Sequence, residues 1–277
     1  MAQSTPRVWL ITGCSSGFGR AMVEEVLHNG EIAVAILRKP SVLDDLVAKY
    51  PHTQLLVLPM DVTNEAQVKS AFAKAKDAFG HIDVVYNNAG QAFYQELEGT
   101  PMVDRAKVLM DVNFWGAVTV SFEAMRFFRE VNPKGAGGIL VQVSSAAATT
   151  GAPMIGFYSS TKAALDSFTE VLAQEASRLE YSVIQFMNVH PGWTRTPIIS
   201  SEMLEPSALY ASELTAVTTK FRAGFDALIN TDLLNSVEVV TKRIWSMTRM
   251  DDEDLHKGMQ EGLVLHKMKT LKIVSGA

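Results

Sequence analysis

The chain has 277 residues, a formal net charge of −5 at neutral pH and a pI near 5.7, and this acidic balance gives no electrostatic footprint for nucleic-acid binding. No apolar run is long enough for a membrane span, and the polar segment Met1–Pro6 enters the first predicted strand without the pattern of a signal peptide. The single cysteine, Cys14, excludes an internal disulfide, and we expect a small buried side chain rather than a nucleophile. A cytoplasmic location is expected.

The N-terminal region predicts a strand, a glycine-rich turn and a helix. Arg7–Ile11 is a short apolar strand, and apolar residues recur at helical spacing from Met22 to Leu27. The turn between them reads Thr12-Gly13-Cys14-Ser15-Ser16-Gly17-Phe18-Gly19, with the spacing GxxxGxG. Backbone N–H groups at such a helix start can hold a pyrophosphate. Gly13 would allow the tight turn, Gly17 the close approach of phosphate and Gly19 the packing of helix on sheet, so dinucleotide binding is predicted.

The end of the second predicted strand, Glu31–Leu37, indicates which dinucleotide is bound. An acidic residue at this point would bind the ribose hydroxyls and select NAD. Here Leu37 is followed by Arg38, whose planar guanidinium can bind a ribose phosphate, so we predict NADP(H) over NAD(H). The alternative is that Arg38 is merely solvated beyond the strand, and the turn before Gly19 carries no second base.

Strands and helices alternate along the rest of the chain. Further strands are predicted at Leu55–Leu58, Ile82–Tyr86, Gly138–Val143 and Val183–Val189. Helices are predicted at Glu65–Phe79, at Met102–Met110 and Phe114–Phe128 with a break near Asn113, and at Phe157–Leu179 and Ser236–Met247. This alternation predicts a Rossmann-type doubly wound parallel sheet in three α/β/α layers, formed by one domain of residues 1–277.

The C-terminal part departs from this alternation. Residues from about 199 to 234 are predicted to form a helical substrate lid, and residues 248–277 match no element, although Gly262–His266 is a candidate for a last edge strand. Asp251–Asp254 and the basic stretch Lys267–Lys272 remain unplaced. His256 and His266 are interpreted as surface residues, because no cysteine or carboxylate cluster stands at ligand spacing, and no metal site is expected.

Tyr158 and Lys162 form a candidate acid/base pair, and Ser145 lies thirteen residues upstream of the tyrosine. Positions i and i+4 share a helix face, so the spacing places a phenol beside an ammonium. A free tyrosine has a pKa near ~10, and a nearby positive charge favours the phenolate. The pair alone is common on exposed helices and does not decide the function.

The ordered set of motifs resembles the short-chain dehydrogenase/reductase family over about residues 7 to 197. The set comprises the glycine-rich turn, Asp61-Val62, Asn87-Asn88-Ala89-Gly90, Asn113, Ser145, Tyr158, Lys162 and Pro191-Gly192 through Thr196. Within the family, the glycine-rich turn and Ile36-Leu37-Arg38 look most like the reductases related to hydroxysteroid and retinol dehydrogenases.

The resemblance implies a role for each candidate residue. Tyr158 would protonate the alkoxide formed by hydride transfer, Ser145 would donate a hydrogen bond to the same oxygen, and Lys162 would hold the nicotinamide ribose and lower the pKa of Tyr158. Asn113 would anchor a water that leads from Lys162 toward solvent. The implied cofactor contacts are Gly13, Ser15, Ser16, Gly17, Phe18, Gly19, Arg38, Asp61, Val62, Asn88, Ala89, Gly90, Tyr158, Lys162, Pro191, Gly192, Thr194 and Thr196.

The residues around this centre predict a hydrophobic ketone or its alcohol as substrate. They are mostly apolar or aromatic, namely Gln91, Phe93, Tyr94, Met154, Ile155, Phe157, Trp193, Ile198, Ile199, Met203 and Leu204. Many of these side chains could instead fill the core. The alternative functions are an NADP(H)-binding regulatory sensor and a non-redox cyclase or isomerase, but all four catalytic residue types are present, which favours the oxidoreductase.

Two predicted helices carry more apolar residues than one buried face needs. Phe114–Phe128 contains Val118, Val120, Phe122, Met125, Phe127 and Phe128, and Phe157–Leu179 is similar. Family members commonly pair these helices across two-fold axes, so we predict a homodimer or homotetramer. The alternative is that an extended C-terminal lid covers the same surface.

Overall fold

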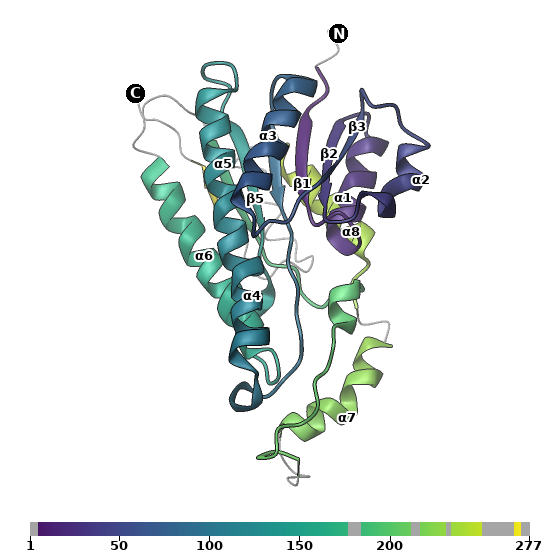
Figure 1. Ribbon diagram of the computed structural model, residues 1–277, viewed down its shortest axis with the longest axis vertical. Helices are drawn as coiled ribbons and strands as arrows, with labels where there is room; N and C mark the ends of the chain where they lie inside the picture. Colours follow the sequence, from purple (N-terminus) through teal and green to yellow (C-terminus); the bar gives the residue numbers. More distant parts are fainter. Residues whose placement is uncertain (1–4, 177–183, 212–216, 231–233, 251–268, 273–277) are drawn as a thin grey trace.

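The computed structural model of the protein describes residues 5–176, 184–211, 217–230, 234–250 and 269–272 (Figure 1). Its centre is one seven-stranded sheet in the order β3-β2-β1-β4-β5-β6-β7. Strands β1 to β6 are parallel, and β7 runs antiparallel to β6. The strands are β1 (Val8–Thr12), β2 (Ile32–Leu37), β3 (Leu55–Pro59), β4 (Val84–Asn87), β5 (Gly138–Val143), β6 (Ile184–Val189) and β7 (Lys269–Lys272). The predicted doubly wound fold is confirmed.

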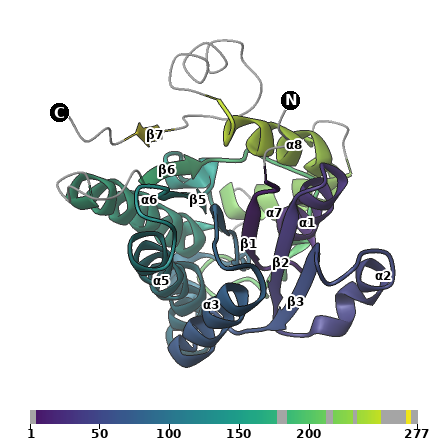
Figure 2. The ribbon, with the colours of Figure 1, turned by 90° about the horizontal axis from the view of Figure 1, so that it is seen from above.

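Helices cover both faces of the sheet, as Figure 2 shows from above. One face carries α1 (Gly17–His28) and α8 (Val237–Met247), and α2 (Asp44–Val47) lies beyond β2 on the same side. The opposite face carries α3 (Glu65–Phe79), α5 (Ala117–Glu130) and α6 (Gly156–Ala176). Because both faces are covered, the central strands are largely apolar, and β1 is buried at every position.

The helix predicted at Glu65–Phe79 is confirmed with the same bounds, because both of its ends carry strong local signals. The Asn64 side chain caps the N-terminus by accepting a hydrogen bond from the Gln67 N–H. Gly80 ends the helix with φ 78°, in the left-handed region that glycine adopts without strain.

The predicted break near Asn113 is wrong. The chain stays helical from Met102 to Glu130, with π-helical segments at Met102–Lys107 and Asp111–Gly116 on either side of α4 (Val108–Met110). The wider π turn inserts an extra residue without ending the helix, which accommodates Asn113 within a continuous rod.

The described C-terminal segments contain a helix in the region predicted as a lid and an edge strand. Helix α7 (Val217–Ile229) lies within the predicted lid and below α8 in Figure 1. The edge strand β7 falls in the unplaced basic stretch. The candidate strand Gly262–His266, the acidic run Asp251–Asp254 and His256 lie outside the described residues. Within the described ranges, no helix has the length and apolarity needed to cross a membrane.

Candidate active site

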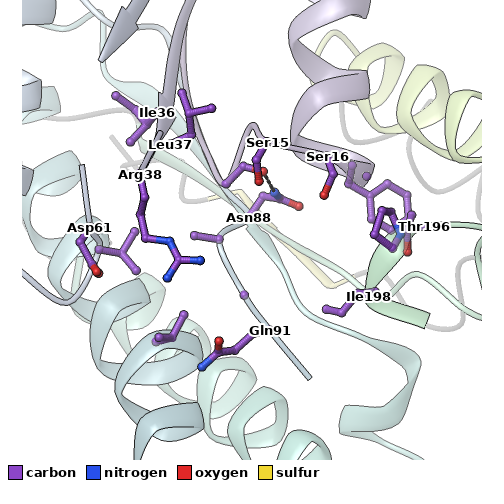
Figure 3. Close-up of a pocket in the computed structure, with 18 of the residues that line it drawn as sticks. Ser15, Ser16, Ile36, Leu37, Arg38, Asp61, Asn88, Gln91, Thr196 and Ile198 are labelled. Atoms are coloured by element: carbon purple, nitrogen blue, oxygen red, sulfur yellow. Dashed lines mark hydrogen bonds between the residues drawn. The ribbon is translucent and has the colours of Figure 1, made fainter. Parts of the chain in front are cut away.

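The carboxyl ends of the parallel strands meet at one edge of the sheet, where ligands of open α/β folds bind. A cavity of about 190 Å³ lies there, between the glycine-rich turn after β1, the end of β2 and the segment after β4 (Figure 3). Its lining includes the predicted cofactor residues Gly13, Ser15, Ser16, Gly17, Phe18, Arg38, Asp61, Val62, Asn88, Ala89, Gly90 and Thr196.

The glycine-rich turn is tightly packed against the segment after β4. Gly13 has φ +72°, and a Cβ built on it would lie 2.8 Å from the Ala89 Cα. A Cβ on Gly19 would lie 2.2 Å from the Gly13 carbonyl oxygen, so Gly19 serves packing rather than lining the cavity. Thr12 Oγ1 accepts hydrogen bonds from the backbone N–H groups of Asn88 and Ala89, each at 2.9 Å. The absence of side chains at Gly13 and Gly19 therefore allows the turn to pack closely on the segment after β4.

Cys14 is fully buried in this turn. Its thiol donates to the Ile11 carbonyl oxygen, and burial raises the pKa of the thiol despite an opposing backbone hydrogen bond at Ile36. A thiol kept protonated in this way is a poor nucleophile, which agrees with its interpretation as a small filler.

The outer end of the first cavity carries the Arg38 side chain. Leu37 is buried, and the following Arg38 extends its guanidinium into the cavity, near Asp61 in Figure 3. Hydrogen bonding from Thr63 and the charge of Arg38 hold the pKa of Asp61 below its ordinary value, although partial burial opposes them. Within the described part of the chain, the Arg38 guanidinium forms no hydrogen bond or ion pair. It is therefore available to an anionic ligand.

A second cavity of about 410 Å³ continues from the first, and the two share Phe18, Asn88, Gly90, Thr196 and Ile198. Ser145, Tyr158 and Lys162 line it, together with the predicted cofactor residues Pro191, Gly192 and Thr194. The structure thus places the two halves of the predicted site in one continuous cleft. Of the predicted site residues, Gly19 and Asn113 line neither cavity.

Lys162 is buried, with 4% of its surface exposed, and its Nζ donates a 2.7 Å hydrogen bond to the Val143 carbonyl oxygen. Burial lowers its pKa from 10.5 to about 8, and the charge of Asp166 opposes this decrease. The Lys162 ammonium lies 5.9 Å from the centroid of the Tyr158 ring.

The pKa of Tyr158 differs from the sequence expectation. Burial raises it, and a hydrogen bond with Ser145 only partly opposes the increase. We expected Lys162 to lower this pKa, but its ammonium binds the Val143 carbonyl rather than the phenol, so burial dominates. The free protein therefore keeps Tyr158 protonated at neutral pH, which suits a proton donor.

Asn113 lines neither cavity, but its side chain hydrogen-bonds residues on two segments that border the cleft. Its Nδ2 donates to the Gln91 carbonyl at 2.9 Å and to Thr161 Oγ1 at 3.1 Å, and its Oδ1 accepts from the Gln91 N–H at 2.9 Å. A Cβ on Gly90 would lie 3.4 Å from Asn113 Oδ1 and 3.6 Å from Lys162 Nζ. Asn113 thus connects α6 with the segment after β4, directly behind Lys162.

The outer wall of the second cavity is apolar. Of the predicted wall residues, Tyr94, Ile155, Trp193, Ile198 and Ile199 line it. Gln91 lines the first cavity, whereas Phe93, Met154, Phe157, Met203 and Leu204 line neither. Sequence reasoning missed the small lining residues Ala92, Ala146, Ala147, Thr150 and Ala152, which carry no signal beyond their size.

The lid helix packs on this wall through an aromatic cluster. Tyr94 and Phe225 have ring centroids 4.5 Å apart, and Phe221 packs against both. Met154 belongs to the same cluster and has φ 72°, a strained value for a residue with a side chain. The cluster places α7 next to Tyr158, which is packed against it.

The sequence model described as short chain dehydrogenase matches residues 7–205. The chain belongs to the short-chain dehydrogenase family. An oxidoreductase of Botryotinia fuckeliana, BOA17, is 36% identical over 201 residues, which cover 73% of this chain and 70% of that protein. The 3-ketodihydrosphingosine reductase of Bacteroides thetaiotaomicron is 30% identical, over 70% of this chain and 68% of that protein.

Solved structures agree with this assignment. A short-chain dehydrogenase from Streptomyces avermitilis has a TM-score of 0.76 to this chain at 25% identity, covering 94% of both chains. Members of the family are oxidoreductases that use nicotinamide cofactors. The matched part of this short-chain dehydrogenase spans between 62% and 70% of the length of the first curated relatives.

Proposed function

We propose that the protein is an NADP(H)-dependent oxidoreductase that transfers a hydride between the nicotinamide and a hydrophobic ketone or secondary alcohol. The observation that carries this proposal is the continuous cleft, which has the glycine-rich cradle at one end and Ser145, Tyr158 and Lys162 at the other. The start of α1 and the residues before it, Ser15, Ser16 and Gly17, line the first cavity, so backbone N–H groups at a helix start are available there to a pyrophosphate, and the residues present fit a dinucleotide.

The bound nicotinamide would supply or accept the hydride. In the direction of reduction, the Tyr158 hydroxyl gives its proton to the oxygen that becomes an alkoxide, and Ser145 donates a hydrogen bond to the same oxygen. Ser145 suits this role because it already hydrogen-bonds Tyr158 in the free protein. Lys162 places a positive charge beside the cofactor ribose and favours the phenolate after proton transfer.

The choice of NADP(H) over NAD(H) is supported by the end of β2. The side chain of Leu37 offers no acceptor for ribose hydroxyls, and the Arg38 guanidinium in the cavity, which has no partner among the described residues, suits a ribose phosphate. The apolar wall and the lid helix support a hydrophobic substrate. A relative named as a 3-ketodihydrosphingosine reductase agrees with this class.

Replacing Tyr158 with Phe tests the proposed function, since the substitution removes the proton donor and keeps the ring. We expect kcat to fall by about 10²-fold or more, with NADPH affinity and thermal stability retained. The assay follows NADPH absorbance with a panel of hydrophobic ketones, and Tyr50→Phe, at a half-buried tyrosine that lines neither cavity of the site, is the matched control. Near wild-type kcat in Tyr158→Phe would show that the acid/base assignment is wrong.

The same panel separates the alternative functions. Tight NADPH binding by the wild type without turnover of any ketone or alcohol would favour a regulatory sensor. Conversion of a substrate without a change in NADPH absorbance would instead favour a non-redox cyclase or isomerase. The four residue types at Asn113, Ser145, Tyr158 and Lys162 support the oxidoreductase over both.

A further inference from the structure

A buried hydrogen bond between an aspartate and a histidine lies one helical turn from Lys162 and has no part in the proposed chemistry. Asp166 is on α6, one helical turn after Lys162, and its Oδ2 lies 2.6 Å from His190 Nε2. The two side chains are only 16% and 4% exposed. His190 follows β6 and immediately precedes Pro191-Gly192, which line the second cavity. The pair therefore joins α6, which carries Tyr158 and Lys162, to the Pro191-Gly192 turn that borders the second cavity.

The negative charge of Asp166 has an effect on Lys162 that a neutral hydrogen bond to His190 would not have. An amide at position 166 could also accept a hydrogen bond from His190, so the tie between α6 and β6 does not require a charge. The carboxylate adds a negative charge near the buried ammonium of Lys162 and opposes the effect of burial on its pKa. Asp166 Oδ1 is buried and accepts no hydrogen bond from the described residues.

We propose that Asp166 is a positioning residue that acts on the reaction through Lys162 and is held in place by His190. The proposal rests on the proposed role of Lys162 in cofactor binding and catalysis. Asp166 keeps Lys162 charged at neutral pH, and the hydrogen bond to His190 fixes the carboxylate on the side of α6 that faces β6. The titratable groups facing Lys162 in the described structure are Tyr158, Asp166 and, behind the carboxylate, His190.

The direction of the effect follows from the two opposing causes. Burial lowers the pKa of Lys162, and Asp166 raises it, giving about 8 in the intact protein. Without the carboxylate, burial acts alone and the pKa falls further, so a larger part of the Lys162 population is neutral at pH 7.5 than in the intact protein. A purely structural role for Asp166 would change stability without moving this titration.

Competitive labelling of the free protein with acetic anhydride across pH 6 to 10 measures the titration of Lys162 directly, by mass spectrometry of its peptide. We expect Asp166→Asn to lower the Lys162 pKa by about one unit, and Asp166→Glu, which keeps the charge, to shift it less. Asp77→Asn, an exposed carboxylate on α3, is the matched control. An unchanged Lys162 titration in Asp166→Asn, or an equal shift in Asp77→Asn, would overturn the proposal.

His190 provides a second, independent variant. His190→Gln keeps a nitrogen donor for Asp166, and we expect a Lys162 titration close to that of the wild type. His190→Leu removes the donor, and we expect the titration to shift as the carboxylate loses its anchor. Equal behaviour of Gln and Leu at this position would contradict the positioning role of His190.

The labelling requires no cofactor or substrate, so its outcome is separate from that of the proposed function. A shifted titration in Asp166→Asn together with unchanged NADPH affinity from pH 7 to 9 would support the effect on Lys162 but contradict its role in cofactor binding. NADPH affinity is expected to weaken as the pH rises and Lys162 loses its charge. If this weakening begins at a lower pH in Asp166→Asn than in the wild type, the result supports both the effect on Lys162 and the role of Lys162 in cofactor binding.

Discussion

The Arg38 side chain lies where a ribose phosphate would discriminate between the two nicotinamide cofactors. We expect Arg38→Ala to raise the KM for NADPH by about 10- to 100-fold and to leave that for NADH little changed, because a charge-assisted hydrogen bond is lost only with the phosphate. Leu37→Asp should reverse the preference by repelling the phosphate and accepting from the ribose hydroxyls. The measurement is kcat/KM for each cofactor with one ketone.

Lys39→Ala serves as the control for this cofactor prediction. Lys39 is the adjacent exposed cation and lines neither cavity, so it should leave the ratio of kcat/KM values unchanged. If the ratio stays the same in both Arg38→Ala and Leu37→Asp, the end of β2 does not select the cofactor.

At the scale of single residues, spacing pointed to those candidate catalytic side chains that share a local element or a known interval. Tyr158, Lys162 and Ser145 were found in this way, and they line one cavity. The Asp166–His190 pair was not predicted, because its members are 24 residues apart and meet only when α6 packs on β6. The hydrogen bond from Lys162 to Val143 was also missed, since backbone acceptors have no sequence signal.

Among the elements, strands were predicted well because each one is an apolar run bounded by turn residues, as in β2 and β5. The π-helical segments were not predicted, because an i→i+5 hydrogen bond has no characteristic residue pattern. Strand β7 was left unplaced since its sequence, Lys269-Thr270-Leu271-Lys272, is half basic. Lysines are common in edge strands, where their charge opposes pairing with other chains. A strand of this composition has no apolar pattern by which it could be predicted.

The lid is joined to the main body by a buried ion pair between Glu96 and Arg222 of α7. Arg222 Nε and Nη2 donate to the two Glu96 oxygens at 3.0 and 2.8 Å, and Nη1 donates to the Leu204 carbonyl at 2.6 Å. Burial raises the pKa of Glu96, but hydrogen bonds from Arg222 and from backbone N–H groups outweigh it, and the net shift is downward. The pair therefore stabilises the lid above the ordinary pKa of 4.5 and weakens as the pH falls below it.

Glu96→Gln should loosen this lid. We expect the free energy of unfolding to fall by at most about 3 kcal/mol, because Arg222 is partly exposed and can recover some solvation. Limited proteolysis should then cut faster within α7, and KM for a large hydrophobic ketone should rise more than kcat falls. In the wild type, the same proteolytic sensitivity should develop as the pH falls from 4.5 through the lower pKa that Glu96 has in the folded protein.

Glu202→Gln is the control for the lid, since the Glu202–Arg105 ion pair is exposed and should contribute little. Equal proteolysis rates for Glu96→Gln and Glu202→Gln would show that the buried pair does not hold α7 in place.

At the scale of the whole molecule, one flank of the chain leaves aromatic residues exposed. Five of the six apolar residues that suggested an interface, Val118, Val120, Met125, Phe127 and Phe128, are buried in the monomer, so they need no partner. Phe122 alone of that set is exposed, at 56%, and it continues a seven-residue spacing from Val108 and Trp115, which are 45% and 57% exposed. The exposed apolar residues Val108, Trp115 and Phe122 therefore form a stripe along the continuous helical segment that contains α4 and α5, and we now place the predicted interface at this stripe.

The stripe borders α6, whose Phe168 ring lies 5.7 Å from Phe122 and 6.2 Å from Phe114. Val171 of α6, three residues after Phe168, is 51% exposed, and Figure 1 shows α4, α5 and α6 along one flank. An apolar surface of this kind favours self-association through a two-fold axis. A homodimer or homotetramer built on α4, α5 and α6 therefore remains our prediction.

Light scattering at micromolar concentration tests this assembly, and the wild type should have at least twice the 30.3 kDa mass of the chain. Phe122→Glu should give a particle of 30.3 kDa, because a desolvated carboxylate at the centre of the interface has no partner. Val239→Glu on α8 makes the same change at an equally exposed apolar residue outside the stripe and should leave the assembly intact. A wild-type mass of 30.3 kDa would contradict the dimer, and a mass that falls in both variants would place the contact elsewhere.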